Sequence, residues 1–193
     1  MSCTVKSILK LAVSQIGYKE SGNNVTKYSK DFDGKWWQWF NTKKQGAAWC
    51  AIFVCWLFCQ DMGPSKAYTF LGMPKNKNDN CAAAVPYFYE YLNKKGYKAT
   101  SPKAGDIIFL NGNKHVGIVE KVKDNKVYTI EGNKSNMVKR SSYGLSSKSI
   151  YGYMRPKYEA ETTTYSGNKP VTMSLIDDLA HQCIQGKFGN YPD

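Results

Sequence analysis

Along the first half of the chain, hydrophobic residues recur with the spacing of α-helices. The first twenty residues carry an apolar stripe made of Ile8, Leu9, Leu11, Ala12 and Ile16. A second helix is expected from about Trp49 to Met62, an almost unbroken apolar run that stops at Gly63-Pro64. A third is expected from about Val85 to Lys95. This half of the chain is therefore predicted to be mainly helical.

After Gly96 the pattern changes from helical spacing to short strands. Five runs rich in β-branched and aromatic residues are separated by turn residues: GDIIFL, HVGIVEKV, KVYTIEG, NMVKR and SIYGYMRP. Helices followed by antiparallel strands predict an α+β domain, expected to span residues 1–157. A polar, Thr-rich linker is expected at 158–172 and one further amphipathic helix within 173–193.

The predicted helix from Trp49 holds three of the six cysteines. At 100° per residue, Cys55 lies about 140° around the axis from Cys50, and Cys59 about 180°, so the three thiols cannot converge on one metal ion. We interpret Cys55 and Cys59 as buried core residues. Cys50 follows the flexible QGAA at the helix start, where unpaired backbone N–H groups favour a thiolate. Cys50 is therefore the candidate nucleophile.

A cysteine nucleophile needs a base and a group that orients the base. His115 begins a predicted strand, and the next strand is KVYTIEG. A three-residue connection at 123–125 would place position 115 opposite 133, so that His115, Glu131 and Asn133 project from one side of the sheet. An acceptor from Glu131 or Asn133 would then hold the imidazole in the tautomer that accepts the thiol proton.

The order of these motifs resembles that of a CHAP domain, the cysteine/histidine-dependent amidohydrolase/peptidase of phage and bacterial wall lysins. The resemblance covers about residues 5–156 through WCAIFV, GDIIF, HVGIVE, TIEGN and IYGYMRP. It implies a papain-like α+β fold, with helices packed on an antiparallel sheet. It also implies Cys50 as nucleophile, His115 as base, Glu131 as the group orienting His115, and Asn133 as the fourth member of a polar tetrad.

The resemblance further implies that the backbone N–H of Cys50 helps to hold the oxyanion. Many relatives place Gln directly before the nucleophile, whereas Trp49 stands here, so the second oxyanion donor is unassigned and Tyr18 is a candidate. Trp36 and Trp37, in the run WWQWF, are candidates with Trp49 for substrate contact. The alternative for the WWQWF run is aromatic packing beneath the loop.

The resemblance leaves two further segments to interpret. Asp31 and Asp33, in DFDG, are similar to the calcium loop of some CHAP lysins, but that loop normally lies nearer the nucleophile and no later acid is in register. We therefore expect no cofactor, with these carboxylates as the calcium candidates. Residues 173–193 resemble the opening of a three-helix wall-binding repeat that stops half-way, with His181 on its polar face.

The charge of the chain is +12 and is unevenly distributed. Residues 158–193 carry a net charge of −3, which leaves +15 on the predicted domain. A basic domain suits a polyanionic target such as a teichoic-acid-rich Gram-positive wall. Nucleic acid is disfavoured because no binding motif or clustered Arg stripe is present.

These observations lead to a peptidoglycan hydrolase that cleaves an amide bond, as either an N-acetylmuramoyl-L-alanine amidase or a peptide endopeptidase. The alternative is a CHAP-fold wall-binding or partner-binding module without activity. Lys10 interrupts the apolar start, so no signal peptide is expected, and no run is long enough to insert in a membrane. We expect a monomeric endolysin, made in the cytoplasm and released to the wall by a holin.

Overall fold

The computed structural model describes residues 3–161, 163–164 and 170–171, and the chain divides into two compact units, Met1–Glu159 and Ala160–Asp193. In the second unit, strand β7 (Thr163–Thr164) pairs antiparallel with β8 (Pro170–Val171), within the segment predicted to be a linker. The helix predicted within 173–193, its partial wall-binding repeat and His181 lie outside the described residues.

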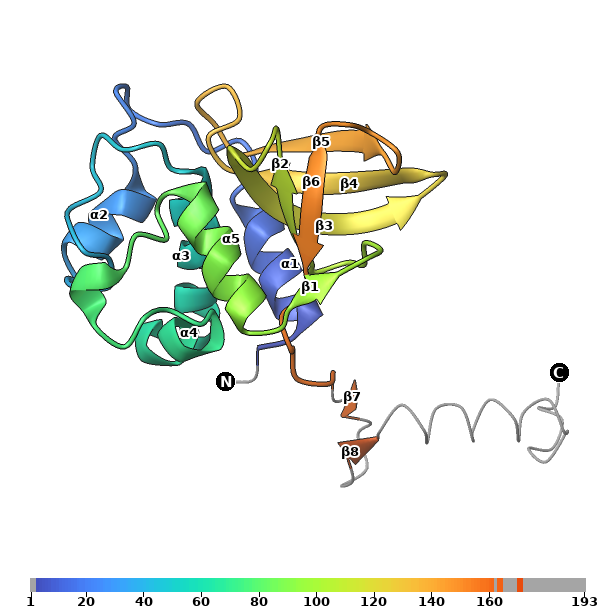
Figure 1. Cartoon of the computed structure of the whole chain (residues 1–193), viewed down its shortest axis with the longest axis horizontal. Coiled ribbons are helices and arrows are strands. Elements are labelled where there is room, and N and C mark those ends of the chain that lie inside the picture. Colours follow the sequence, from blue (N-terminus) through green and yellow to red (C-terminus); the bar gives the residue numbers. More distant parts are fainter. Residues whose placement is uncertain (1–2, 162, 165–169, 172–193) are drawn as a thin grey trace, which may run out of the picture. The chain divides into compact units, whose positions relative to one another are not determined.

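The first unit begins with helices and continues into strands, so the predicted α+β class is confirmed (Figure 1). Its helices are α1 (Val5–Ser14), α2 (Lys27–Asp33), α3 (Cys50–Met62), α4 (Pro64–Phe70), the 3₁₀ turn η1 (Lys77–Asp79) and α5 (Val85–Lys94). The helices predicted at Trp49–Met62 and Val85–Lys95 are confirmed as α3 and α5, each to within one residue. In the described part of the chain, no helix is long and apolar enough to span a bilayer.

Two short helices, α2 and α4, lie where the sequence analysis predicted no helix. Helix α2 starts at a capping residue, because the Thr26 hydroxyl accepts a hydrogen bond from the Ser29 N–H at 3.0 Å. Helix α4 follows α3 directly. Gly63, with φ of 87°, ends α3, and Pro64 then occupies the first turn of α4, where its fixed φ and missing N–H cost nothing. The Gly-Pro pair thus ends one helix and starts another.

The strands form one six-stranded sheet in the order β1-β6-β2-β3-β4-β5, with every neighbouring pair antiparallel. They are β1 (Lys98–Ala99), β2 (Ile107–Leu110), β3 (His115–Lys123), β4 (Lys126–Glu131), β5 (Lys139–Gly144) and β6 (Ile150–Met154). Figure 1 shows the helices gathered at one side of this sheet, with α1, α3 and α5 nearest to it. The nucleophile helix and the histidine strand therefore lie in adjoining layers.

Helix α3 forms the centre of the hydrophobic core. Every residue from Cys50 to Cys59 is buried, and the helix contacts α1, α2, α4, α5 and β3. A helix that is apolar all round is expected at such a central place. Burial raises the pKa of the Cys55 and Cys59 thiols well above the usual range, so both are inert core groups, as the helical geometry predicted.

The hairpin between β3 and β4 reaches the predicted register by a different route. The predicted three-residue connection is wrong: Lys123 pairs with Lys126, and Asp124 and Asn125, with φ of 51° and 55°, form a two-residue turn. A bulge between Val119 and Lys121 then shifts the pairing by one residue. Beyond the bulge, Ile118 pairs with Ile130, the register that the prediction required to bring His115 and Glu131 to one side.

Candidate active site

Cys50 is held at the first position of α3 by the packing of the residue before it. Trp49 caps the helix, is fully buried, and donates its indole N–H to Glu20 at 2.7 Å. The Trp49 ring packs against Tyr28, with ring centroids 5.6 Å apart. Cys50 itself is buried but retains 6% exposure, compared with 0% for Cys55 and 2% for Cys59.

His115 lies between Cys50 and Glu131. Its Nε2 is 2.9 Å from Glu131 Oε2, and its side chain also hydrogen-bonds to Cys50. Because Nε2 faces the carboxylate, Nδ1 is the ring nitrogen left for the thiol. The three side chains therefore form a chain of thiol, imidazole and carboxylate, which is the arrangement that nucleophilic cysteine catalysis requires.

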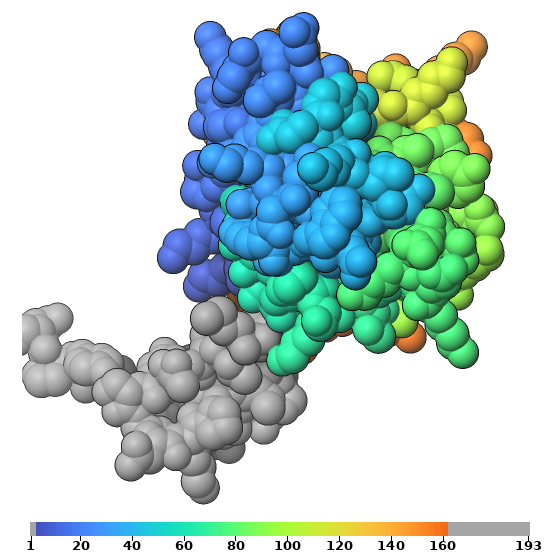
Figure 2. Space-filling model, turned by 90° about the vertical axis from the view of Figure 1, so that its left-hand side faces the viewer, coloured from blue at the N-terminus to red at the C-terminus, as the bar shows by residue number. Residues whose placement is uncertain are grey.

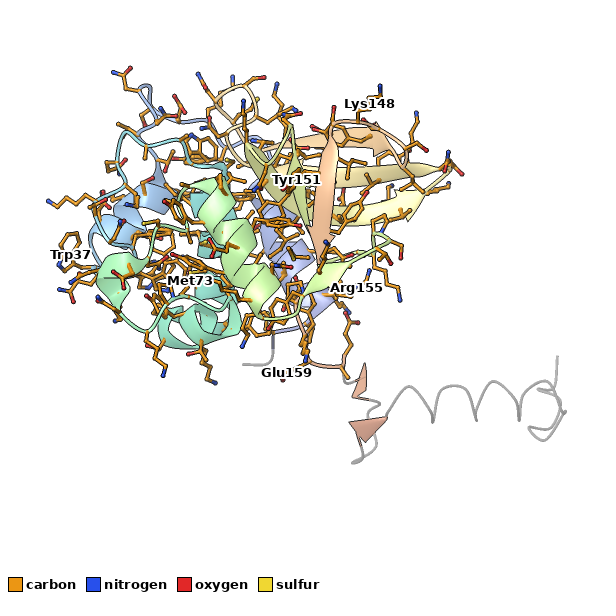
Figure 3. All side chains as sticks on the ribbon, in the orientation of Figure 1. Trp37, Met73, Lys148, Tyr151, Arg155 and Glu159 are labelled. Atoms are coloured by element: carbon orange, nitrogen blue, oxygen red, sulfur yellow. The ribbon has the colours of Figure 1, made fainter. Side chains whose placement is uncertain are left out.

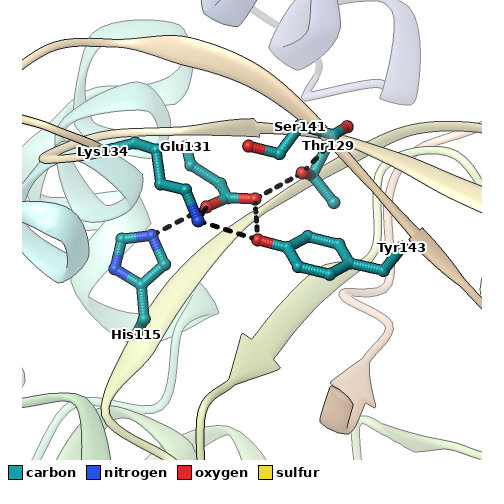
Figure 4. A network of polar contacts seen from close by, with 6 residues as sticks. All are labelled: His115, Thr129, Glu131, Lys134, Ser141 and Tyr143. Atoms are coloured by element: carbon teal, nitrogen blue, oxygen red, sulfur yellow. Dashed lines mark hydrogen bonds and ion pairs between the residues drawn. The ribbon is translucent and has the colours of Figure 1, made fainter. Parts of the chain in front are cut away.

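Glu131 is fully buried and its two carboxylate oxygens are held by four side chains (Figure 4). Oε1 accepts hydrogen bonds from Thr129 Oγ1 at 2.6 Å and from the Tyr143 hydroxyl at 2.9 Å. Oε2 faces His115 and lies 3.4 Å from Lys134 Nζ, which also donates to the Tyr143 hydroxyl at 3.1 Å. This shell compensates a buried charge that would otherwise be costly and fixes the carboxylate toward the imidazole.

The electrostatics of the pair favour the charged forms of both partners. Burial lowers the pKa of His115, but hydrogen bonds and charge interactions with Cys50 and Glu131 outweigh it and raise that pKa to about 9. Burial raises the pKa of Glu131, whereas His115, Thr129 and Lys134 lower it, to about 2. At neutral pH the site therefore holds an imidazolium beside a carboxylate.

Two glycines let the backbone come close enough to build this site. A Cβ at Gly117 would lie 2.7 Å from Glu131 Cγ, and one at Gly132 would lie 2.6 Å from Phe53 Cβ. The first glycine makes room for the Glu131 side chain, and the second lets α3 pack against the end of β4. Both occur in the motifs HVGIVE and IEGN, but the sequence alone does not indicate which neighbours they admit.

Among the described hydrogen bonds, those of the Asn133 and Tyr18 side chains are made to residues other than Cys50, His115 and Glu131. The Asn133 side-chain amide donates to Asn24 Oδ1 at 3.3 Å, and its φ of 56° turns the chain away at the end of β4. The orienting acceptor is thus Glu131 rather than Asn133. The Tyr18 hydroxyl accepts a hydrogen bond from the Lys27 N–H at 2.8 Å, and its ring lies 6.2 Å from Trp49.

The three tryptophans proposed to contact substrate are not in one cleft. Trp49 is fully buried, so it positions Cys50 and presents no face to a ligand. Trp36 and Trp37 line a separate pocket with Pro64 and Ser65, which follow the far end of α3. The loop that carries Trp36 and Trp37 therefore lies at the other end of α3 from Cys50, and their contact with substrate stays a prediction.

The two candidate calcium ligands are engaged by protein donors. Asp31 Oδ2 accepts from the Trp56 indole N–H at 2.7 Å and pairs with Lys35 at 3.0 Å. Asp33 accepts the backbone N–H groups of Lys44, at 2.6 Å, and Gln45, at 2.9 Å. Among the described residues, no group of three His, Cys, Asp or Glu side chains is arranged to hold a metal ion.

Sequence reasoning missed the residues that support the site. Glu20 holds Trp49 from a loop, and Lys134 and Tyr143 hold Glu131 from beyond β4. The closeness of Thr129 to Glu131, two residues apart on one strand face, was the available signal for one of these contacts. The others join segments whose relative placement depends on the folded sheet.

Comparison with known proteins agrees with this geometry. The CHAP domain family matches residues 41–133, slightly under half of the chain, and the match includes Cys50, His115 and Glu131. A crystal structure of Ly7917 has the same fold, with a TM-score of 0.52 and 18% identity over 83% of this chain. The aligned part is 65% of that Ly7917 chain.

A second crystal structure, of Ly7917 with the hydrolyzing product of MDP, matches with a TM-score of 0.48 and 19% identity. That match covers 84% of this chain and 66% of the other. No curated protein sequence matches the chain. At these identities the likeness to Ly7917 concerns the fold, and the chemistry has to be argued from the residues of this chain.

Proposed function

We propose that the protein is a peptidoglycan hydrolase that cleaves an amide bond through a thioacyl-enzyme. One observation carries the proposal: Cys50, at the first turn of α3, hydrogen-bonds to His115, whose Nε2 is 2.9 Å from the buried carboxylate of Glu131. The CHAP domain in residues 41–133 supports the substrate class, since CHAP domains occur in wall lysins.

The chemistry follows from the charge state of the three groups. With His115 protonated, the Cys50 thiolate attacks the amide carbonyl carbon, and the imidazolium donates its proton to the leaving amine. The neutral imidazole then takes a proton from water, whose oxygen attacks the thioester and releases the acyl half. Glu131 remains ionised throughout and keeps the ring oriented through Nε2.

The oxyanion of each tetrahedral intermediate needs hydrogen-bond donors that are already in place. The backbone N–H of Cys50 is suited to this role, because the first N–H groups of a helix have no intrahelical acceptor. The positive end of the α3 dipole adds to the same stabilisation. This places the carbonyl oxygen of the substrate over the start of α3.

The proposal also includes the type of cell wall, the biological role of the enzyme and the bond that it cleaves. The positive charge of the chain, +12, favours a Gram-positive wall that carries anionic polymers. An endolysin that reaches the wall after holin release fits an enzyme of this kind, and we propose that it acts as a monomer without a cofactor. Both the sugar–peptide bond and a bond within the peptide remain as cleavage points.

Mass spectrometry of fragments released from purified walls tests the reaction, with Cys50→Ala analysed in parallel. New free carboxyl groups on the muramic acid lactyl moiety would identify an amidase, and new amino termini within the stem or bridge would identify an endopeptidase. Cys55→Ala is the matched control, because it removes a thiol from the same helix that lies outside the site.

We expect wild type and Cys55→Ala to release fragments and Cys50→Ala to release none above background. If Cys50→Ala releases fragments at the wild-type rate, the proposed nucleophile is wrong. If all three proteins leave the walls intact but bind to them, the chain is a wall-binding module rather than a hydrolase.

A further inference from the structure

An aromatic pocket lies at the opposite end of α3 from Cys50. It encloses about 280 Å³ and its lining includes Trp36, Trp37, Trp39 and Tyr68, with Lys35 and Lys77 at its edge. Trp39 is buried and forms part of its base, whereas Trp37 is 52% exposed. Figure 3 shows the Trp37 side chain projecting outward beside α2. Figure 2 is viewed from that side, and the blue segments at its centre include α2 and the loop that follows it.

The loop that presents Trp37 is held by many backbone hydrogen bonds. The N–H groups of Trp36, Trp37 and Trp39 donate to Asp31, Gly34 and Trp36 carbonyls at 2.9 to 3.1 Å. Gln38 has φ of 66°, an uncommon conformation for a residue other than glycine, and it separates the outward Trp37 from the inward Trp39. A side chain held outward by a loop with these backbone hydrogen bonds and a left-handed Gln38 is organised in advance for binding.

The pocket is physically separate from the catalytic residues. Helix α3 has 13 residues. At 1.5 Å per residue it is about 20 Å long. Cys50 lies at its start, and Pro64 and Ser65, which line the pocket, follow its end. A ligand in the pocket therefore touches neither Cys50 nor His115.

The lining indicates the chemistry of the occupant. An exposed indole beside buried aromatic rings offers a flat apolar face, and such faces on a folded domain mark binding sites. Lys35 pairs with Asp31 at 3.0 Å and lies 4.5 Å from the Trp36 ring centroid, so its charge is already compensated. Lys35 thus supplies hydrogen-bond donors rather than free positive charge, and Lys77, whose Nζ is 5.9 Å from the Tyr68 ring centroid, adds a single cation rather than the cluster that a phosphate polymer would select.

We propose that this pocket is a second binding site for the glycan strand of peptidoglycan. A sugar ring lies with its C–H face on Trp37 while its hydroxyl groups accept hydrogen bonds from Lys35 and Lys77. Its volume accommodates a small part of a ligand, as expected where a strand crosses the surface. The choice of glycan as the ligand rests on the proposed function. The pocket would then give the enzyme a second contact with the wall, away from the bond that is cleaved.

Binding to sacculi tests the site without requiring turnover. The full-length Cys50→Ala protein is the parent, so that the sacculi are not digested, and the sacculi are stripped of phosphate polymers with hydrofluoric acid. Trp37→Ala is made in this parent. The matched control is Tyr87→Ala, which removes another exposed aromatic, on α5, with 50% exposure.

We expect Trp37→Ala to raise the dissociation constant for stripped sacculi about tenfold, as for a central aromatic contact. Tyr87→Ala should stay within about twofold of the parent, and Trp37→Phe should recover most of the binding. Unchanged melting temperatures exclude a folding defect as the cause. A soluble β-1,4-linked N-acetylglucosamine tetramer should compete with the sacculi for the parent and lose that effect in Trp37→Ala.

Three results would overturn the site. Binding of stripped sacculi by Trp37→Ala as tight as that of its parent would contradict the site. A loss seen only on unstripped walls would assign the pocket to phosphate polymers. Conversion of a dimer to a monomer by Trp37→Ala would show that a second copy of the chain covers this face. The binding test uses a parent without Cys50, so it does not depend on hydrolysis. The loss of binding in Trp37→Ala is therefore expected even if the protein is not a hydrolase, and each proposal can be contradicted without the other.

Discussion

Cys50 and Cys59 lie on the same helix and differ in everything that surrounds them. Cys50 occupies the first turn, keeps 6% exposure and hydrogen-bonds to His115. Cys59 lies in the last turns, where burial raises the pKa of its thiol well above the usual range. The side chain and the secondary structure are the same, so the difference comes from helix position and from the sheet residues that reach one end only. Reactivity here is a property of the neighbours of the thiol.

Apart from loss of the nucleophile itself, the largest predicted loss of activity comes from removing the charge that orients His115 toward Cys50. Glu131→Gln keeps the shape of the side chain but loses the carboxylate 2.9 Å from Nε2. We expect kcat for release of wall fragments to fall about 10⁴-fold, as when the carboxylate of a catalytic triad is neutralised. Glu120→Gln is the control, since Glu120 pairs with the exposed Arg140 at 2.7 Å on the same sheet. Equal activity of the two variants would remove Glu131 from the mechanism.

The next largest effect concerns the contact between α3 and the end of β4. A Cβ in Gly132→Ala would lie 2.6 Å from Phe53 Cβ, and we expect a loss of about 1–3 kcal/mol in the free energy of unfolding from overpacking. Activity should fall further than stability explains, because Phe53 follows Cys50 on the same helix. In Gly144→Ala the new Cβ meets nothing within 4 Å, so its unfolding curve should match wild type. Denaturant unfolding of both variants measures the difference.

The pH dependence of the free energy of unfolding tests whether His115 is charged in the folded protein. The folded state raises the pKa of His115 from its ordinary value of 6.5 to about 9, so it favours the protonated ring. The resulting stabilisation is complete below about pH 6.5 and is lost as the pH rises through 9. We expect the stability advantage of wild type over His115→Gln to shrink between pH 7 and 10, in chemical unfolding at each pH. A constant advantage would mean that His115 is not charged in the folded protein.

The smallest expected effect comes from the residues that hold Glu131. Tyr143→Phe removes one hydrogen bond to Oε1, made at 2.9 Å, and should cost about 1 kcal/mol of stability with a several-fold loss of kcat and little change in KM. Thr129 and Lys134 still hold the carboxylate in this variant. Tyr151→Phe, on the 51% exposed Tyr151, is the matched control. A change in KM alone would make Tyr143 a substrate contact instead.

Local sequence patterns predicted the parts of the site that depend on one helix or on two strands that follow each other in sequence. The bounds of α3 and its three cysteine directions follow from helical spacing, and the pairing of His115 with Glu131 follows from strand alternation. The turn between β3 and β4 was predicted one residue too long, and the bulge near Glu120 offsets that error. The two-residue turn and the bulge therefore together produce the register that brings His115 and Glu131 to one side of the sheet.

The remaining contacts join segments that only the folded sheet brings together. Glu20 meets Trp49, and Asn24 meets Asn133, across loops that carry no periodic pattern. For the aromatic run at Trp36 and Trp37 the sequence left substrate contact and packing beneath the loop as alternatives, because the place of this run in the fold depends on where α2 and α4 pack. Those two short helices were not predicted, so the place of the pocket at the far end of α3 could not be inferred from the sequence.

The rate of alkylation at each cysteine of α3 tests the central claim most directly. The native protein is treated with iodoacetamide at pH 7, and Cys50, Cys55 and Cys59 are quantified by peptide mass spectrometry over time. We predict that Cys50 is modified first, that His115→Ala slows its modification, and that Cys55 and Cys59 react only after unfolding. Equal rates at the three cysteines, or a Cys50 rate that His115→Ala leaves unchanged, would contradict the account.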